Sequence, residues 1–195
     1  MENCKISSPN HKAVYNVYCA SGTFGGFSGP NELYSQFDPN RYYCNIIRVH
    51  TSPDLNQCVN ELVDAIIKFN GIENNPIILI GWSQGGYTAI RAVEKLKSNY
   101  APLYKKVKVI IIISSRPEGT DFVSEMTHIT KYIICANLDT PRRINGAHLM
   151  YDKACSPKKF ITIESGTHNY EDTECFHELT NIVRDIISNE TQKLV

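Results

Sequence analysis

The sequence has no long hydrophobic run, no excess of charge of either sign and no paired cysteine motif. Its longest aliphatic run, Val109 to Ile113, is far shorter than the roughly 20 residues that a membrane-spanning helix needs. The first residues, MENCKISSPNHK, contain no apolar core of the kind found in secretory signal peptides. We therefore expect a cytoplasmic protein that does not insert into membranes.

Charge is balanced over the chain, with 20 Lys and Arg residues against 20 Asp and Glu residues. No stretch of like charge concentrates an attractive field, so nucleic acid is not an expected partner. The seven cysteines are scattered without a C-x-x-C pair, and several fall in apolar segments. This favours reduced, buried thiols over a disulfide framework or a zinc site, and we expect no metal and no cofactor.

What the chain does contain is an alternation of short apolar runs with amphipathic segments. Its 195 residues, 42% of them hydrophobic, are enough to bury one core, and we expect residues 1–195 to form a single domain. Runs rich in β-branched or aromatic residues predict strands at Ala13–Cys19, Asn45–His50, Pro76–Gly81, Val107–Ser114, Lys131–Ala136 and Lys159–Glu164. Apolar residues at helical spacing and turn signals predict helices at Leu55–Phe69, Gln84–Leu96, Arg142–Lys153 and Glu174–Ile187.

Several of these strands are continuously apolar rather than alternating, as in Val107–Ser114. Continuous apolar strands are typical of a parallel sheet that helices cover on both faces. The sequence therefore predicts an α/β fold, a three-layer α/β/α sandwich with a mostly parallel sheet of about six strands.

One short segment, Gly81-Trp82-Ser83-Gln84-Gly85-Gly86, lies between a predicted strand and a predicted helix. It matches G-x-S-x-G, in which the serine occupies a tight strand-to-helix turn and the glycines let the two backbones cross. The start of the helix directs free N–H groups and the positive end of its dipole at the same point. We predict that Ser83 is a nucleophile. The alternative is a glycine-rich turn whose serine caps the helix.

A nucleophilic serine needs a base and an acid, which follow such a turn in the order Ser, then Asp or Glu, then His. His168 comes directly after the last predicted strand, at the carboxyl edge of the sheet, and is the predicted base rather than a solvated surface histidine. Asp139 follows the strand that ends at Ala136 and is the predicted acid. Its alternative role is to cap the next helix, and Asp121 is the substitute acid.

An oxyanion hole needs a second donor beside the backbone N–H of Gln84. The glycine-rich loop Ala20–Phe27 follows the first predicted strand, and the N–H of Thr23 is the expected donor. This loop lacks the lysine of a P-loop and does not match G-x-G-x-x-G, so nucleotide binding is disfavoured. A surface turn without a catalytic role is the alternative.

Together, the strand order, the turn at Ser83, the Asp139 loop and Gly166-Thr167-His168 resemble the α/β-hydrolase superfamily. The Ser-Gln-Gly-Gly sequence is most similar to the branch of small carboxylesterases, acyl-protein thioesterases and dienelactone-hydrolase-like proteins. The resemblance covers Ala13 to the C-terminus. It implies Ser83, Asp139 and His168 as a catalytic triad, with Gln84 and Thr23 as oxyanion donors.

The chain departs from that branch at two places. Ser21-Gly22 stands where the branch usually has His-Gly, and Ala136–Arg142 does not match its Gly-x-x-Asp-x-x-Val pattern around the acid. These departures concern which substrate the protein takes and which subfamily it resembles most. Neither departure changes a triad residue.

The segment Ser115–Thr130 is too short to hold the large lid of many lipases, which predicts an open site for a small soluble ester or an exposed acyl group. Trp82, Tyr170 and Arg142 are candidates for substrate contact, and Arg116 and Arg143 lie on loops at the same edge.

The predicted activity is hydrolysis of a carboxylic ester or thioester through an acyl-enzyme on Ser83. Amidase or peptidase action by the same triad, and ligand binding without turnover, are the alternatives. We expect a monomer or a weak homodimer.

Overall fold

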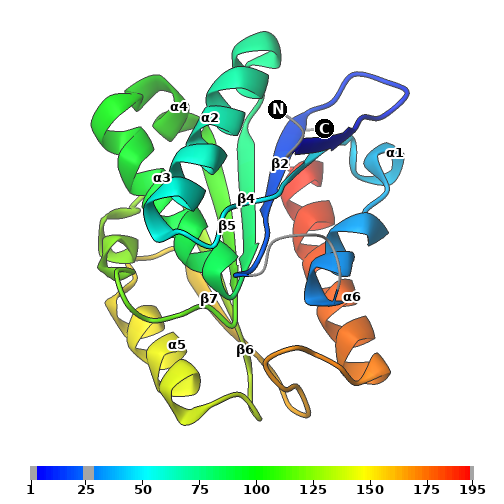
Figure 1. Cartoon of the computed structure of the whole chain (residues 1–195). Coiled ribbons are helices and arrows are strands. Elements are labelled where there is room, and N and C mark those ends of the chain that lie inside the picture. The colour runs from blue at the N-terminus through cyan, green and yellow to red at the C-terminus, as the bar shows by residue number, and fades with distance from the viewer. Residues whose placement is uncertain (1–3, 24–28, 194–195) are drawn as a thin grey trace.

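A computed structural model describes residues 4–23 and 29–193, and its centre is a seven-stranded sheet (Figure 1). The strands are β1 Cys4–Ser7, β2 Tyr15–Ala20, β3 Cys44–Val49, β4 Ile77–Trp82, β5 Val107–Ile113, β6 Thr130–Ala136 and β7 Lys158–Ile163. Their order across the sheet is β1-β3-β2-β4-β5-β6-β7. All neighbouring strands are parallel except β1 and β3, which are antiparallel.

Helices cover both faces of this sheet, as Figure 1 shows. They are α1 Pro39–Tyr42, α2 Leu55–Glu73, α3 Gln84–Asn99, α4 Ala101–Lys106, α5 Pro141–Lys153 and α6 Thr173–Gln192, with 3₁₀ helices at Gly29–Gln36 and Asp121–Glu125. Helices α2, α3 and α5 pack on one face, and α1 and α6 pack on the other. The predicted α/β/α sandwich with a mostly parallel sheet is confirmed.

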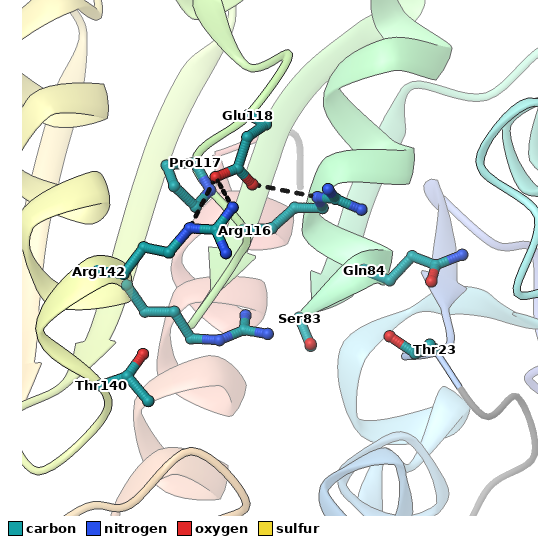
Figure 2. A pocket seen from close by; sticks show the side chains of 9 residues that line it. Thr23, Ser83, Gln84, Arg116, Pro117, Glu118, Thr140 and Arg142 are labelled. Carbon is teal, nitrogen blue, oxygen red and sulfur yellow. Dashed lines mark hydrogen bonds and ion pairs between the residues drawn. The ribbon is translucent and has the colours of Figure 1, made fainter.

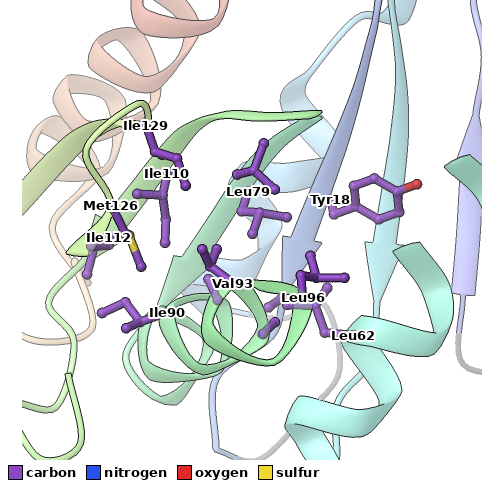
Figure 3. Packing of buried hydrophobic residues seen from close by; sticks show 14 of the residues in the cluster. Tyr18, Leu62, Leu79, Ile90, Val93, Leu96, Ile110, Ile112, Met126 and Ile129 are labelled. Atoms are coloured by element: carbon purple, nitrogen blue, oxygen red, sulfur yellow. The ribbon is translucent and has the colours of Figure 1, made fainter. Parts of the chain in front are cut away.

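The core consists of two hydrophobic layers, one on each face of the sheet. Figure 3 shows the layer under α3, where Ile90, Val93 and Leu96 pack against strand residues such as Leu79 and Ile110. All five of these side chains are completely buried. Burial on both faces explains why β4 and β5 are continuous apolar runs in the sequence.

The six predicted strands correspond to β2 through β7, and the predicted helices correspond to α2, α3, α5 and α6. The structure adds β1, an antiparallel strand at the edge of the sheet that the sequence did not indicate.

Each of the seven cysteines is a free thiol, and all except Cys4 and Cys155 are buried. No helix in the described part of the chain combines the length and the apolarity needed to cross a membrane.

Strand order determines where a site can form. The chain passes from β2 outward to β3, returns over β2 through α2 to β4, and then continues through β5, β6 and β7 in the other direction. The order therefore reverses between β2 and β4. In open α/β sheets, ligands bind at the carboxyl ends of the strands beside such a switch point. Thr23 follows β2 and Ser83 follows β4, so both lie there.

Candidate active site

Ser83 occupies the turn between β4 and α3 with φ 55° and ψ −115°, a left-handed conformation that costs a non-glycine residue about 1–3 kcal/mol. Its backbone N–H donates to the carbonyl of Ile113 on β5 at 2.8 Å, which fixes the turn to the sheet. A Cβ atom on Gly81 would lie 2.1 Å from the backbone carbonyl carbon of Gly85, so the strand and the helix cross only because this residue is glycine. The turn presents the Ser83 hydroxyl at the floor of a pocket.

His168 lies on the loop between β7 and α6 and bridges the two other predicted triad residues. Its Nε2 atom is 3.1 Å from the hydroxyl oxygen of Ser83, and its Nδ1 atom is 2.8 Å from Oδ2 of Asp139. Because an ionised carboxylate only accepts hydrogen bonds, Nδ1 carries the proton and Nε2 is left as an acceptor for the Ser83 hydroxyl. This tautomer is the one that a general base needs.

Trp82 holds the His168 loop from the side. The indole N–H donates to the backbone carbonyl of His168 at 3.0 Å, and the two ring centroids are 5.2 Å apart. Trp82 is therefore in contact with the imidazole and is not among the residues that line the pocket. The structure thus places Trp82, a candidate for substrate contact, against the predicted base His168.

The Asp139 side chain lies in the loop between β6 and α5 and is completely buried. The backbone N–H of Leu138 donates to the carbonyl of Gly166 at 2.9 Å, which holds this loop beside the loop that carries His168. Oδ2 accepts from His168, and Oδ1 accepts from the backbone N–H of Thr140 at 2.7 Å. Thr140, not Asp139, is the N-cap residue of α5, so the capping alternative is wrong.

The surroundings of Asp139 favour its ionised form. Burial raises its pKa, but the hydrogen bonds from His168 and the Thr140 N–H, with the charges of His168 and Arg143, outweigh burial and hold the pKa below its ordinary value. Asp121, the substitute acid, lies in a 3₁₀ helix with its side chain 77% exposed and paired with Lys153. It is not part of the hydrogen-bonded chain around His168.

The residues of the two expected oxyanion donors, Gln84 and Thr23, both line the same pocket. Gln84 is the first residue of α3, whose initial N–H groups have no intrahelical partner. Its side-chain amide donates to the carbonyls of Ser52 at 3.0 Å and Pro53 at 3.1 Å, which anchors the start of α3 to the β3–α2 connection. Thr23 is exposed and lines the pocket, whereas residues 24–27 of the predicted loop lie outside the described part of the chain.

The pocket over Ser83 has a volume of about 410 Å³. It is lined by Thr23, Ser83, Gln84, Arg116, Pro117, Glu118, Thr140, Arg142 and Arg143. Figure 2 shows Ser83 between two walls, with Gln84 and Thr23 on one side and Thr140 and Arg142 on the other. Arg142, a candidate for substrate contact, therefore lines the pocket that contains Ser83.

Tyr170, the other predicted substrate contact, points away from this pocket. It adopts φ 49°, is 2% exposed, and packs in the core beside α6. Its hydroxyl is 2.9 Å from the hydroxyl of Ser114 at the end of β5. Sequence analysis did not single out Glu118, whose only signal was its place beside Arg116 on the connection after β5.

The described residues contain no group of three or more His, Cys, Asp or Glu side chains that could hold a metal ion.

No protein-family model and no curated protein matches the sequence. Solved structures do match the fold. Est1E from Butyrivibrio proteoclasticus is 14% identical, with a TM-score of 0.76 over 97% of this chain and 94% of its own. A dienelactone hydrolase from Anabaena variabilis is 14% identical, with a TM-score of 0.73 over 93% and 88%. Alpha/beta hydrolase domain-containing protein 10 from mouse is 15% identical, with a TM-score of 0.69 over 95% and 93%. The chain therefore has the fold of the α/β hydrolases.

Proposed function

We propose that the protein is a serine hydrolase that cleaves a carboxylic ester or thioester through an acyl-enzyme on Ser83. The observation that carries this proposal is the unbroken chain of hydrogen bonds from Asp139 through His168 to the hydroxyl of Ser83, at 2.8 and 3.1 Å. The names of the structural neighbours support it, since they include an esterase domain from Rhodothermus marinus and a dienelactone hydrolase.

In the acylation step, Nε2 of His168 takes the proton from Ser83 as the hydroxyl oxygen attacks the carbonyl carbon. Asp139 stabilises the imidazolium that forms, because its buried carboxylate remains ionised and accepts from Nδ1. His168 then gives the proton to the departing alcohol or thiol. General base catalysis of this kind contributes about 10²–10⁴ in rate.

The backbone N–H groups of Gln84 and Thr23 bind the oxyanion in both steps. The dipole of α3 adds positive potential at its first residue, where the negative charge develops. Loss of one such donor costs about 10²–10³ in kcat. Water, activated by His168, then attacks the acyl-enzyme and releases the acid.

The experiment is the hydrolysis of a p-nitrophenyl ester series by the wild type, by Ser83→Ala and by a matched control, Ser98→Ala. Ser98 lies on the same helix and is exposed, and its hydroxyl donates to the carbonyl of Glu94 one turn earlier. We expect Ser83→Ala to lose at least about 10⁴ in kcat/KM and Ser98→Ala to match the wild type. Equal turnover in all three proteins would refute the proposal. Ligand binding without turnover by folded wild type would point to a binding protein instead.

A further inference from the structure

The wall of the pocket that faces Thr23 is rich in arginine. Arg116 comes from the connection after β5, and Arg142 and Arg143 come from the first turn of α5. Among the nine lining residues, Pro117 is the single apolar one. An anionic group would find charge-assisted donors on this wall.

Part of this wall already binds a carboxylate. Oε1 of Glu118 accepts from Nε of Arg142 at 3.0 Å and from its Nη2, and Oε2 accepts from Nε of Arg116 at 3.3 Å (Figure 2). The two guanidinium groups therefore converge on one carboxylate at the edge of the pocket. The arginines of this wall are therefore placed so that they bind a carboxylate. Glu118 itself neutralises part of their positive charge.

Arg143 is held differently. Its side chain is 26% exposed, and Nη1 donates to the backbone carbonyl of Ser114 at 2.9 Å. Its Nε atom is 3.9 Å from Oδ1 of Asp139, an oxygen that already accepts from the Thr140 N–H. Among the described residues, Nη2 of Arg143 has no hydrogen-bond partner. This arginine is thus fixed in position and keeps a donor for a ligand in the pocket that contains Ser83.

The charges around the pocket do not cancel. Three guanidinium groups face two carboxylates, Glu118 and Asp139, and Asp139 also stabilises His168. The excess is positive in a partly enclosed space, where electrostatic attraction is stronger than in bulk water.

We propose that the pocket binds esters or thioesters that carry a carboxylate, and that Arg143 contacts this carboxylate. This proposal rests on the serine hydrolase function proposed above. Arg116 and Arg142 strengthen the positive field, and Glu118 weakens it. The carboxylate can belong to the acyl half or to the leaving half of the substrate, and the two cases differ in which synthetic ester is preferred.

Two ester pairs test the proposal, each differing in one charge. For the acyl half, mono-p-nitrophenyl glutarate is compared with its methyl-capped diester; for the leaving half, 3-acetoxybenzoate is compared with its methyl ester. After subtraction of uncatalysed hydrolysis, we expect the anionic member of one pair to have the higher kcat/KM by about tenfold or more, the size of one hydrogen bond to a charged group. The preference should shrink as salt rises.

Variants make the test specific because two of them act in opposite directions. Arg143→Gln should remove the preference, and Glu118→Gln should increase it. Arg91→Gln is the matched control: it removes the same charge from α3, about two turns from Ser83, where Arg91 pairs with Glu94. It should leave the ratio unchanged. Equal or lower kcat/KM for the anionic ester in both pairs, or a ratio that Arg143→Gln does not alter, would overturn the proposal.

Failure of the proposed function gives a different result from failure of this site. If folded wild type hydrolyses neither pair, the hydrolase proposal fails, and equilibrium dialysis with radiolabelled glutarate then tests the site alone. Saturable binding that Arg143→Gln abolishes and Arg91→Gln retains supports the carboxylate site. Absence of saturable binding overturns it.

Discussion

Replacing Asp139 by asparagine tests how strongly catalysis depends on the hydrogen bond that Asp139 accepts from His168. In the wild type, Oδ1 accepts from the Thr140 N–H at 2.7 Å and Oδ2 accepts from Nδ1 of His168 at 2.8 Å. Asparagine has one oxygen, and the Thr140 N–H holds it in the Oδ1 position. The amide NH₂ group then faces Nδ1, where the wild type has an acceptor.

Two donors cannot share this contact, so the imidazole shifts its proton to Nε2 and loses the atom that accepts from Ser83. We expect kcat for an ester substrate to fall by about four orders of magnitude, with KM little changed. The assay is steady-state hydrolysis of p-nitrophenyl acetate, with circular dichroism to verify folding.

Asp121→Asn is the matched control, because it makes the same substitution at the other acid considered from sequence. Asp121 is exposed and pairs with Lys153, and exposed ion pairs contribute about 0–1 kcal/mol to stability. We expect this variant to keep wild-type kcat. The reasoning is wrong if Asp121→Asn loses activity, or if Asp139→Asn retains it.

Asp139→Asn should also change the pH dependence of stability. Because the folded-state pKa of Asp139 lies below its unfolded value of about 3.9, its ionised carboxylate contributes stability that is fully present well above that pH and is lost as the pH falls through the folded pKa. Urea unfolding near pH 7 should show Asp139→Asn less stable than the wild type by about 1.5–3 kcal/mol. The difference should narrow in acid, and a constant difference at every pH would argue against an ionised Asp139.

Three further predictions concern the surroundings of the site. Trp82→Phe keeps a ring beside His168 but loses the 3.0 Å hydrogen bond to its carbonyl, so kcat should fall by up to about tenfold while the fold, followed by circular dichroism, is retained. Gly81→Ala forces a Cβ to within 2.1 Å of backbone, and urea unfolding should show a loss of about 3 kcal/mol or more, together with loss of esterase activity. A thiol reagent should label Cys4 and Cys155 first in the native protein and all seven cysteines after denaturation; rapid labelling of a third thiol in the native state would contradict the observed burial.

The central strands were predictable from sequence because their burial on both faces leaves a direct pattern. Val107–Ile113 is an almost unbroken aliphatic run, and the neighbouring strand β4 begins with four aliphatic residues. β1 was missed for the opposite reason: its four residues are exposed or partly exposed, so no alternation or apolar run distinguishes it. Its place in the sheet comes from the antiparallel ladder with β3, a long-range contact.

The three residues of the candidate triad could be predicted from their order in the chain and their positions after strands. Ser83, Asp139 and His168 each lie in the connection that follows a strand, and the carboxyl ends of parallel neighbouring strands meet at one edge of the sheet. Asp121 also follows a strand, and sequence alone did not exclude it. The structure distinguishes the two acids. The backbone N–H of Leu138 donates to the carbonyl of Gly166, which holds the Asp139 loop beside the His168 loop, whereas the Asp121 side chain is exposed and pairs with Lys153.

The directions in which the side chains near the site point could not be predicted from the sequence. Tyr170 comes two residues after His168, yet its positive φ turns the ring into the core. Trp82 precedes Ser83 and contacts the imidazole rather than the pocket. The association of Glu118 with Arg142 joins the connection after β5 to the first turn of α5, and neither sequence indicates the other.

The most direct test of the central claim is mass spectrometry of the intact protein after incubation with a fluorophosphonate, followed by peptide mapping. The proposed mechanism predicts one adduct per wild-type chain, located on Ser83, with no adduct on Ser83→Ala and greatly slowed labelling of His168→Ala. Absence of an adduct on folded wild type, or an adduct that persists in Ser83→Ala, would contradict the claim that Ser83 is an activated nucleophile.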